Sequence, residues 1–130
     1  MKTDIDIKDD IFRFIKDSAL HSEISGNIYK TKRPNNSFLE DITISVLANS
    51  NAGIQESMVY VNIYVRDIER DNVFIENTIR LRELCRLSAE LLEVGRVNSS
   101  RFQLSEQRVI ESASNEHVII NKLLFRQCNN

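Results

Sequence analysis

Four acidic residues are the first candidates for chemistry in this sequence, because they flank segments with the pattern of β-strands. They are Glu40, Asp41, Asp67 and Glu69. Carboxylates gathered at strand ends can hold a divalent cation that activates water, which is the chemistry of a metal-dependent nuclease. Acidic residues beside strands are also common as solvated side chains, and no paired lysine follows these at a fixed spacing. A small metal-dependent nuclease is therefore kept as an alternative.

The other reactive side chains do not form a known catalytic motif. His21 and His117 are far apart, and neither belongs to an HExxH or HxH pattern. Cys85 and Cys128 have no histidine at a recognisable spacing and form no CxxC pair, so we expect two reduced thiols in a cytoplasmic protein. With only three glycines, the chain has no GxGxxG, GxxxxGK[ST] or GxSxG motif. We predict a chain that is not an enzyme and needs no metal or cofactor.

Length and charge narrow the class of protein further. The 130 residues fit a single domain spanning 1–130, and 42% hydrophobic content is enough to fill one core. The 17 basic and 19 acidic residues are mixed along the chain, which provides no long-range field for DNA, RNA or an acidic membrane. The charged segment 1–10 lacks the apolar core of a secretion signal, and no apolar run approaches the ~20 residues that cross a bilayer. We expect no membrane and no specific nucleic-acid partner.

The first part of the chain predicts one helix and one short strand. Apolar residues recur at helical spacing in 10–22, and three acidic residues precede them, where the helix dipole favours negative charge. The residues of the predicted apolar face are Ile11, Phe12, Phe14, Ile15 and Ala19. We expect this helix to end near Gly26, followed by a strand at 27–31 and a loop at 32–37.

The middle of the chain changes to the two-residue period of β-strands. Segment 41–47 alternates apolar and polar residues, and 49–53 is predicted to be a polar connection. Segment 58–66 is the strongest predicted strand, with a β-branched face that should lie under the helices. That face holds Val59, Val61, Ile63 and Val65, and the opposite face holds Tyr60, Asn62, Tyr64 and Arg66.

The last part predicts a second helix and a long hairpin. After the charged stretch 67–71, an apolar stripe that includes Cys85 runs through 81–92, and Gly95 is a plausible end of this helix. Phe102, Leu104 and Ile110 are predicted to lie on the same face of one long strand. A turn is predicted at 113–116, and 118–125 is predicted to be the second strand of the hairpin. The predicted fold class is α+β, with two helices packed on a twisted, mainly antiparallel sheet in the order α-β-β-β-α-β-β.

Exposed β-structure is the main functional hint. The first and last strands are candidates for open edges, which invite pairing with another chain. The 101–126 hairpin looks longer than one helix can cover, and its alternating residues Arg101, Gln103, Ser105 and Gln107 predict a polar face suited to a wet contact. The candidate interface residues are Lys30, Lys32, Arg33, Tyr60, Tyr64, Arg66, Arg101 and Gln103. The basic residues Lys30, Lys32 and Arg33 could bind a phosphate, but they have no interleaved aromatic residues, which favours a solvated loop or salt bridges to another subunit. The alternative for the sheet face is that the chain's own loops or second hairpin cover it.

Several segments, taken with the element order and size, carry a resemblance to a known family. The segments are Ile28-Tyr29-Lys30, Arg33-Pro34-Asn35-Asn36-Ser37, Glu40-Asp41-Ile42-Thr43-Ile44, Val61-Asn62-Ile63-Tyr64-Val65 and Glu116-His117-Val118-Ile119-Ile120-Asn121. Over nearly the whole chain this pattern resembles the tail terminator (tail-completion, or minor tail) proteins of long-tailed bacteriophages and prophages. None of the segments is a catalytic signature, and the connection 49–56 is shorter than ring proteins often use there.

The resemblance implies a structural role. It implies a homo-oligomeric ring, typically a hexamer, that caps the finished tail tube and docks to the head connector. Such a protein would be found in the bacterial cytoplasm during assembly and then in the virion tail. A ring requires a head-to-tail interface whose rotation closes. Another neck or tail-adaptor protein of similar fold, the nuclease, and a stand-alone cytoplasmic binding module for a peptide or small ligand remain the alternatives.

Overall fold

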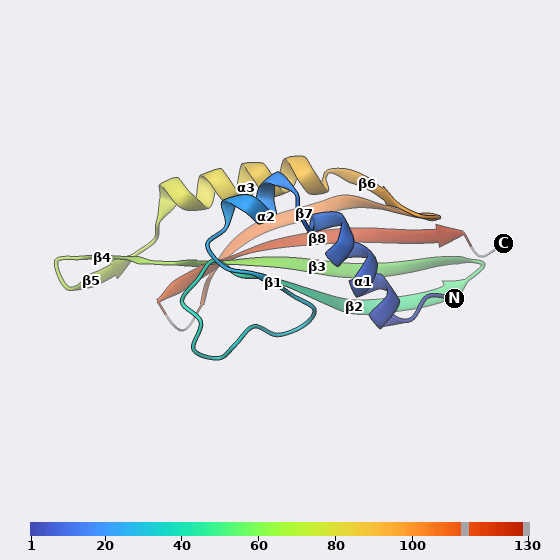
Figure 1. Cartoon of the computed structure of the whole chain (residues 1–130), viewed down its shortest axis with the longest axis horizontal. Helices are drawn as coiled ribbons and strands as arrows, with labels where there is room; N and C mark the ends of the chain where they lie inside the picture. Colours follow the sequence, from blue (N-terminus) through green and yellow to red (C-terminus); the bar gives the residue numbers. More distant parts are fainter. Residues whose placement is uncertain (113–114, 129–130) are drawn as a thin grey trace.

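The computed structural model, which describes residues 1–112 and 115–128, is built on one six-stranded sheet with helices on one face (Figure 1). The strand order is β1-β2-β3-β8-β7-β6, and every pairing is antiparallel except that of β1 with β2. The strands are β1 (Ile28–Tyr29), β2 (Ile42–Ala52), β3 (Ile54–Arg66), β6 (Val94–Val97), β7 (Ser100–Ser112) and β8 (Glu116–Cys128). The predicted α+β class is confirmed.

The predicted first helix is two helices. The first, α1 (Asp4–Ile15), begins earlier than expected because Thr3 and Asp6 form a capping box at its start. It ends before Asp17, whose positive φ of 62° is incompatible with a continuing helix. The second, α2 (Ala19–Glu23), starts again because the Ser18 side chain caps it. The break between α1 and α2 leaves Ala19 exposed to solvent. The prediction that Ala19 belongs to the apolar face was therefore wrong.

The strand β3 confirms the strongest strand of the sequence. Its residues Val59, Val61, Ile63 and Val65 are buried under the helices, as predicted. It also extends further towards the N-terminus than predicted. Of the predicted connection 49–53 only Gly53 is a turn, because β2 and β3 stay paired through to Ala52 opposite Ile54. The prediction of a polar connection failed because polar side chains can lie on the covered side of a strand when they are hydrogen-bonded.

The polar end of the β2–β3 pair is held by the start of the chain. Asn49 lies on the helix-covered side, where its Nδ2 donates to Asp4 Oδ1 at 2.9 Å. Ser57 Oγ donates to Asn49 Oδ1 at 2.9 Å, and Gln55 Nε2 donates to the Lys2 carbonyl at 2.7 Å. These bonds satisfy groups that would otherwise be costly to bury, so a polar sequence continues as strand.

The last strand is not a sheet edge, contrary to the sequence prediction. β8 lies between β3 and β7, so its two edges are both paired. The edge strands are β6 and the first strand, β1, which was predicted to be an edge. Both are short: β1 covers β2 at two positions, and β6 covers β7 from Ser100 to Gln103. In the described chain, the outer edge of β7 over 106–112 has no strand partner.

A bulge in β7 reverses the parity of the predicted hairpin. Leu104 pairs with Leu123 and Glu106 pairs with Lys122, so Ser105 is an extra residue. After it, Gln107 faces the helices and its Nε2 donates to the Cys85 carbonyl at 2.9 Å and Asn121 Oδ1 at 2.8 Å. Ile110 is therefore not on the same face as Phe102, and Gln107 is not on the predicted polar face.

The second predicted helix is confirmed as α3 (Thr78–Leu92). Leu81, Leu84, Ser88 and Leu92 are buried on its inner face. Cys85 beside them is a free, half-buried thiol, and this burial raises its pKa. The helix ends before Gly95, which lies in β6 rather than at the helix end. A Cβ at Gly95 would overlap the Phe102 ring, so the glycine serves a close strand contact.

The charged stretch after β3 contains a hairpin that sequence analysis missed. β4 (Ile68–Arg70) pairs with β5 (Val73–Ile75), and Asp71 and Asn72 form the turn with φ of 53° and 65°. Two successive positive φ values are typical of a type I′ turn. This hairpin projects beyond the end of the six-stranded sheet (Figure 1), and we call it the arm.

Candidate interaction surfaces

Three of the four acidic residues proposed for a nuclease site are held in separate contacts within the chain. Glu40 Oε2 accepts a hydrogen bond from Arg80 Nε at 2.7 Å, and hydrogen bonding to Glu40 raises the pKa of Arg80. Asp41 is buried and accepts the backbone N–H of Asn27 at 3.0 Å. Asp67 Oδ1 lies 2.7 Å from the Nδ1 of a histidine on β8, whereas Glu69 is exposed on β4.

Within 1–112 and 115–128, no three His, Cys, Asp or Glu side chains are grouped so that they could hold a metal ion. Over the same residues, no helix has the length and apolar character needed to cross a membrane.

The loop between β1 and β2 covers one end of the outer face, which is the sheet face without helices. The guanidinium of Arg33 stacks 4.1 Å from the centre of the Tyr64 ring, and Arg66 stacks 4.3 Å from the centre of the Phe38 ring. Arg33 also pairs with Glu116, at 3.3 Å between Nη2 and Oε2. The structure thus brings three of the candidate interface residues together, in contacts that fasten the chain's own loop.

The two candidate lysines lie away from that stack. Lys30 Nζ is 2.7 Å from Asp9 Oδ1 and 5.0 Å from the centre of the Phe12 ring, so it ties β1 to α1. Lys32 is exposed in the loop. The predicted basic loop therefore does not converge into a single phosphate cradle, because Lys30 and Arg33 are engaged in different directions.

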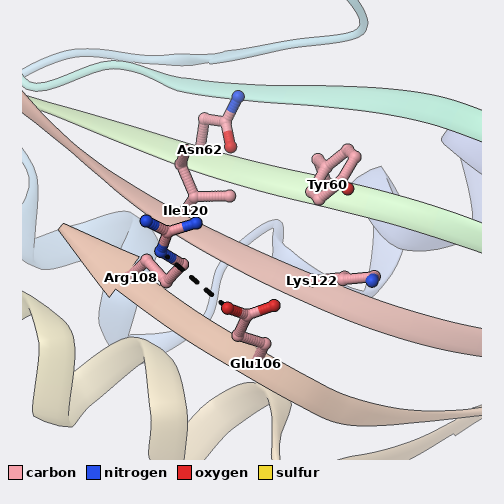
Figure 2. Close-up of a pocket in the computed structure, with 6 residues that line it drawn as sticks. All are labelled: Tyr60, Asn62, Glu106, Arg108, Ile120 and Lys122. Atoms are coloured by element: carbon pink, nitrogen blue, oxygen red, sulfur yellow. Dashed lines mark ion pairs between the residues drawn. The ribbon is translucent and has the colours of Figure 1, made fainter. Parts of the chain in front are cut away.

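The middle of the outer face is hollowed into a shallow, open depression of about 220 Å³. Figure 2 shows its side chains, which come from the three central strands β3, β8 and β7. The lining residues are Tyr60, Asn62, Glu106, Arg108, Ile120 and Lys122. Arg108 Nε lies 3.8 Å from Glu106 Oε1, and the buried Oδ1 of Asn62 has no hydrogen-bond partner in the described structure. This mixed lining suits a polar, wet contact.

A row of arginines crosses the outer face at the end of the sheet away from the arm. Arg96 on β6 is directly opposite Arg101 on β7, and Arg101 is directly opposite Arg126 on β8. Glu56 on β3 continues the row as the partner of Arg126, at 3.3 Å between Nε and Oε1. Together with Ile54, we call these residues the arginine groove, and they line a hollow of about 560 Å³.

Sequence analysis identified only part of the arginine groove. Arg101 was a candidate interface residue, and Gln103, two positions further along β7, lines a smaller hollow beside it. Arg96 and Arg126 were missed because they lie on different strands. No local pattern relates them to Arg101; only the register of three strands does.

The arm carries exposed apolar side chains beyond the end of the sheet. All six of its strand residues are exposed, including Val73 at 57% and Phe74 at 37%. Its root is held by His117, whose Nδ1 lies 2.7 Å from Asp67 and whose Nε2 lies 3.3 Å from Glu76 Oε2. One histidine thus contacts both ends of the hairpin, which orients it away from the sheet.

Comparison with protein-family models and with curated proteins finds no significant match to this chain. Its function must therefore be argued from these surfaces and from the resemblance of its sequence pattern.

Proposed function

We propose that this chain is a structural tail-completion protein of a bacteriophage or prophage. In this role, copies of the chain assemble into a closed ring, typically a hexamer in the family it resembles, that caps the tail tube and docks to the head-connector proteins. The ring would form in the bacterial cytoplasm and become part of the virion tail.

The observation that carries this proposal is the projecting arm. A two-stranded hairpin with three residues a side is at best marginally stable alone in water. The arm nevertheless exposes Ile68, Val73 and Ile75 on one face and Phe74 on the other. Exposed apolar side chains gathered on one small element mark an interaction site. A partner that buries the arm would supply the stabilisation that the rest of this chain does not.

The sheet edges and the outer face support the same proposal. Helices cover only one face, so the outer face and the free edge of β7 over 106–112 remain accessible. An exposed edge adds another strand readily, and the polar depression suits a specific contact. Contact surfaces at different places on one subunit are what a closed head-to-tail ring requires.

The test is the mass of the full chain in solution across a wide concentration range, with and without tail-tube and head-connector proteins. Sedimentation equilibrium should give a closed multimer of one size, and negative-stain electron microscopy should show rings at tube ends. A chain that stays monomeric and binds neither partner would overturn the proposal. Mg²⁺- or Mn²⁺-dependent cleavage of DNA by that monomer would favour the nuclease instead.

A further inference from the structure

The arginine groove is incomplete as an electrostatic unit. Arg96, Arg101 and Arg126 stand side by side at directly opposed positions, where like charges destabilise a sheet. The only ion pair of these arginines to described residues joins Arg126 to Glu56. The groove therefore presents three guanidinium groups and one carboxylate to solvent. Its excess positive charge suits an acidic ligand. Because guanidinium groups bind carboxylates in a two-pronged geometry, acidic side chains fit this groove well.

The arm carries the features that the groove lacks. Its turn region holds the exposed acidic residues Glu69 and Asp71, separated by Arg70, beside exposed apolar side chains. The groove in turn offers Ile54, which is 53% exposed, next to its arginines. Each surface thus combines charge with apolar area, and the two excess charges are opposite in sign.

The two surfaces cannot meet within one chain. Glu56 in the groove and Arg66 beside the arm are about ten positions apart on the same continuous strand β3, which is about 33 Å at 3.3 Å per residue. Figure 1 shows the arm at one end of the sheet and β6, with the turn between β2 and β3, at the other. Complementary surfaces at opposite ends of a rigid body produce a head-to-tail contact between copies.

We propose that the arm of one copy docks into the arginine groove of the next, with Glu69 and Asp71 pairing with Arg96 and Arg101. Phe74, which is directly opposite Glu69 and so shares its face of the arm, packs near Ile54. This inference rests on the proposed function, because it names the contact by which the ring would close. A second copy is favoured over nucleic acid as the ligand, because the groove contains Glu56 and exposed Ile54, which a phosphate chain would not use.

Two charge-reversed full-length variants test the contact. The groove variant is Arg96→Glu with Arg101→Glu, and the arm variant is Glu69→Arg with Asp71→Arg. Each alone should weaken self-association by about 100-fold, because it places like charges face to face in the contact. An equimolar mixture of the two should assemble again, since every contact in an alternating array pairs opposite charges. Sedimentation equilibrium measures both effects.

Matched controls separate this contact from general charge effects. Arg82→Glu reverses a positive charge on the exposed side of α3, and Glu90→Arg reverses a negative charge on the same helix. Both should assemble like the unmodified chain. Circular dichroism with a thermal melt checks that every variant is folded.

The outcomes distinguish this inference from the proposed function. Rings that survive both reversals would overturn the arm–groove contact and leave the ring proposal standing. The unmodified chain could instead form open chains or dimers. If each reversal dissociates them and the mixture restores them, the arm–groove contact is supported and the ring is contradicted. Unmodified chain that stays monomeric at all concentrations would overturn both. If the groove variant loses binding to a short DNA duplex and keeps its self-association, the groove serves nucleic acid instead.

Discussion

The two faces of the sheet differ in what they contribute, although the same strands form both. On β3, Val61 and Ile63 face the helices and are fully buried, while Tyr60 and Asn62 between them are only half-buried on the outer face. The covered face removes apolar area from water at about 25 cal/mol per Å², so it supplies most of the stability. The outer face is charged, stacked and hollowed, and it leaves surface for contacts with other molecules.

Folding and the proposed assembly should therefore be separable in this protein. A change on the covered face should act on stability, and a change at the ends of the outer face should act on assembly. Both surfaces are specified by alternate residues of one strand, so neighbouring positions should respond in different measurements.

The largest effect is expected on the covered face. Leu84→Asp places a charge at a fully buried position of α3 and should cost about 4 kcal/mol or more, enough to unfold the chain. Chemical denaturation followed by circular dichroism measures this. Val94→Asp, at a position 71% exposed, is the matched control and should be close to neutral. Equal stability of the two variants would break the comparison between faces.

The next effect is expected at the two ends of the outer face. Paired reversal, Arg66→Glu with Arg101→Glu, should leave the fold intact and abolish assembly. The structure adds that these residues lie at opposite ends of the sheet, so the single variants sharpen the test. Arg101→Glu should carry most of the loss, because it lies in the arginine groove. Size-exclusion chromatography with light scattering provides the measurement, and unimpaired assembly of the double variant would show that neither arginine belongs to the interface.

A smaller effect is expected at the root of the arm. His117→Ala removes the contact to Asp67 and should destabilise this region by about 1–2 kcal/mol, with little loss of global stability. Hydrogen exchange of the amides in 67–76 should become faster. His21→Ala removes a different histidine contact, near Asp17, and should leave those amides unchanged. If exchange in the arm is the same in both variants, His117 does not orient it.

Much of the fold follows from local pattern. The alternation of 58–66 and the apolar stripe of 81–92 predicted β3 and α3 because their inner residues must all reach the same core. The turn predicted at 113–116 implied a hairpin of the strands on either side of it, and β7 and β8 do pair. Residues 113 and 114 of that turn lie outside the described structure. Strong periodicity over ten or so residues is readable without knowledge of the partner strand or helix.

The errors occurred where a distant contact or a local backbone irregularity overrides the periodic pattern. The polar segment 49–52 continues as strand, and its inward side chain Asn49 is hydrogen-bonded to Lys2 and Asp4. The helix break at Asp17 depends on a left-handed residue and a new cap, which apolar spacing does not reveal. The extra residue Ser105 exchanges the faces of β7, and a shift of one residue in a strand reverses every side chain beyond it.

Local sequence, then, was sufficient for the α+β class, the principal helix and strands, and the expectation that exposed β-structure is the working surface. The arginine groove and the direction of the arm depended on the folded chain. Arg96, Arg101 and Arg126 become neighbours only through hydrogen-bond register across three strands, and His117 reaches the arm only because β8 lies in the middle of the sheet. Register is set by the summed fit of many distant side chains, so no short stretch of residues encodes it.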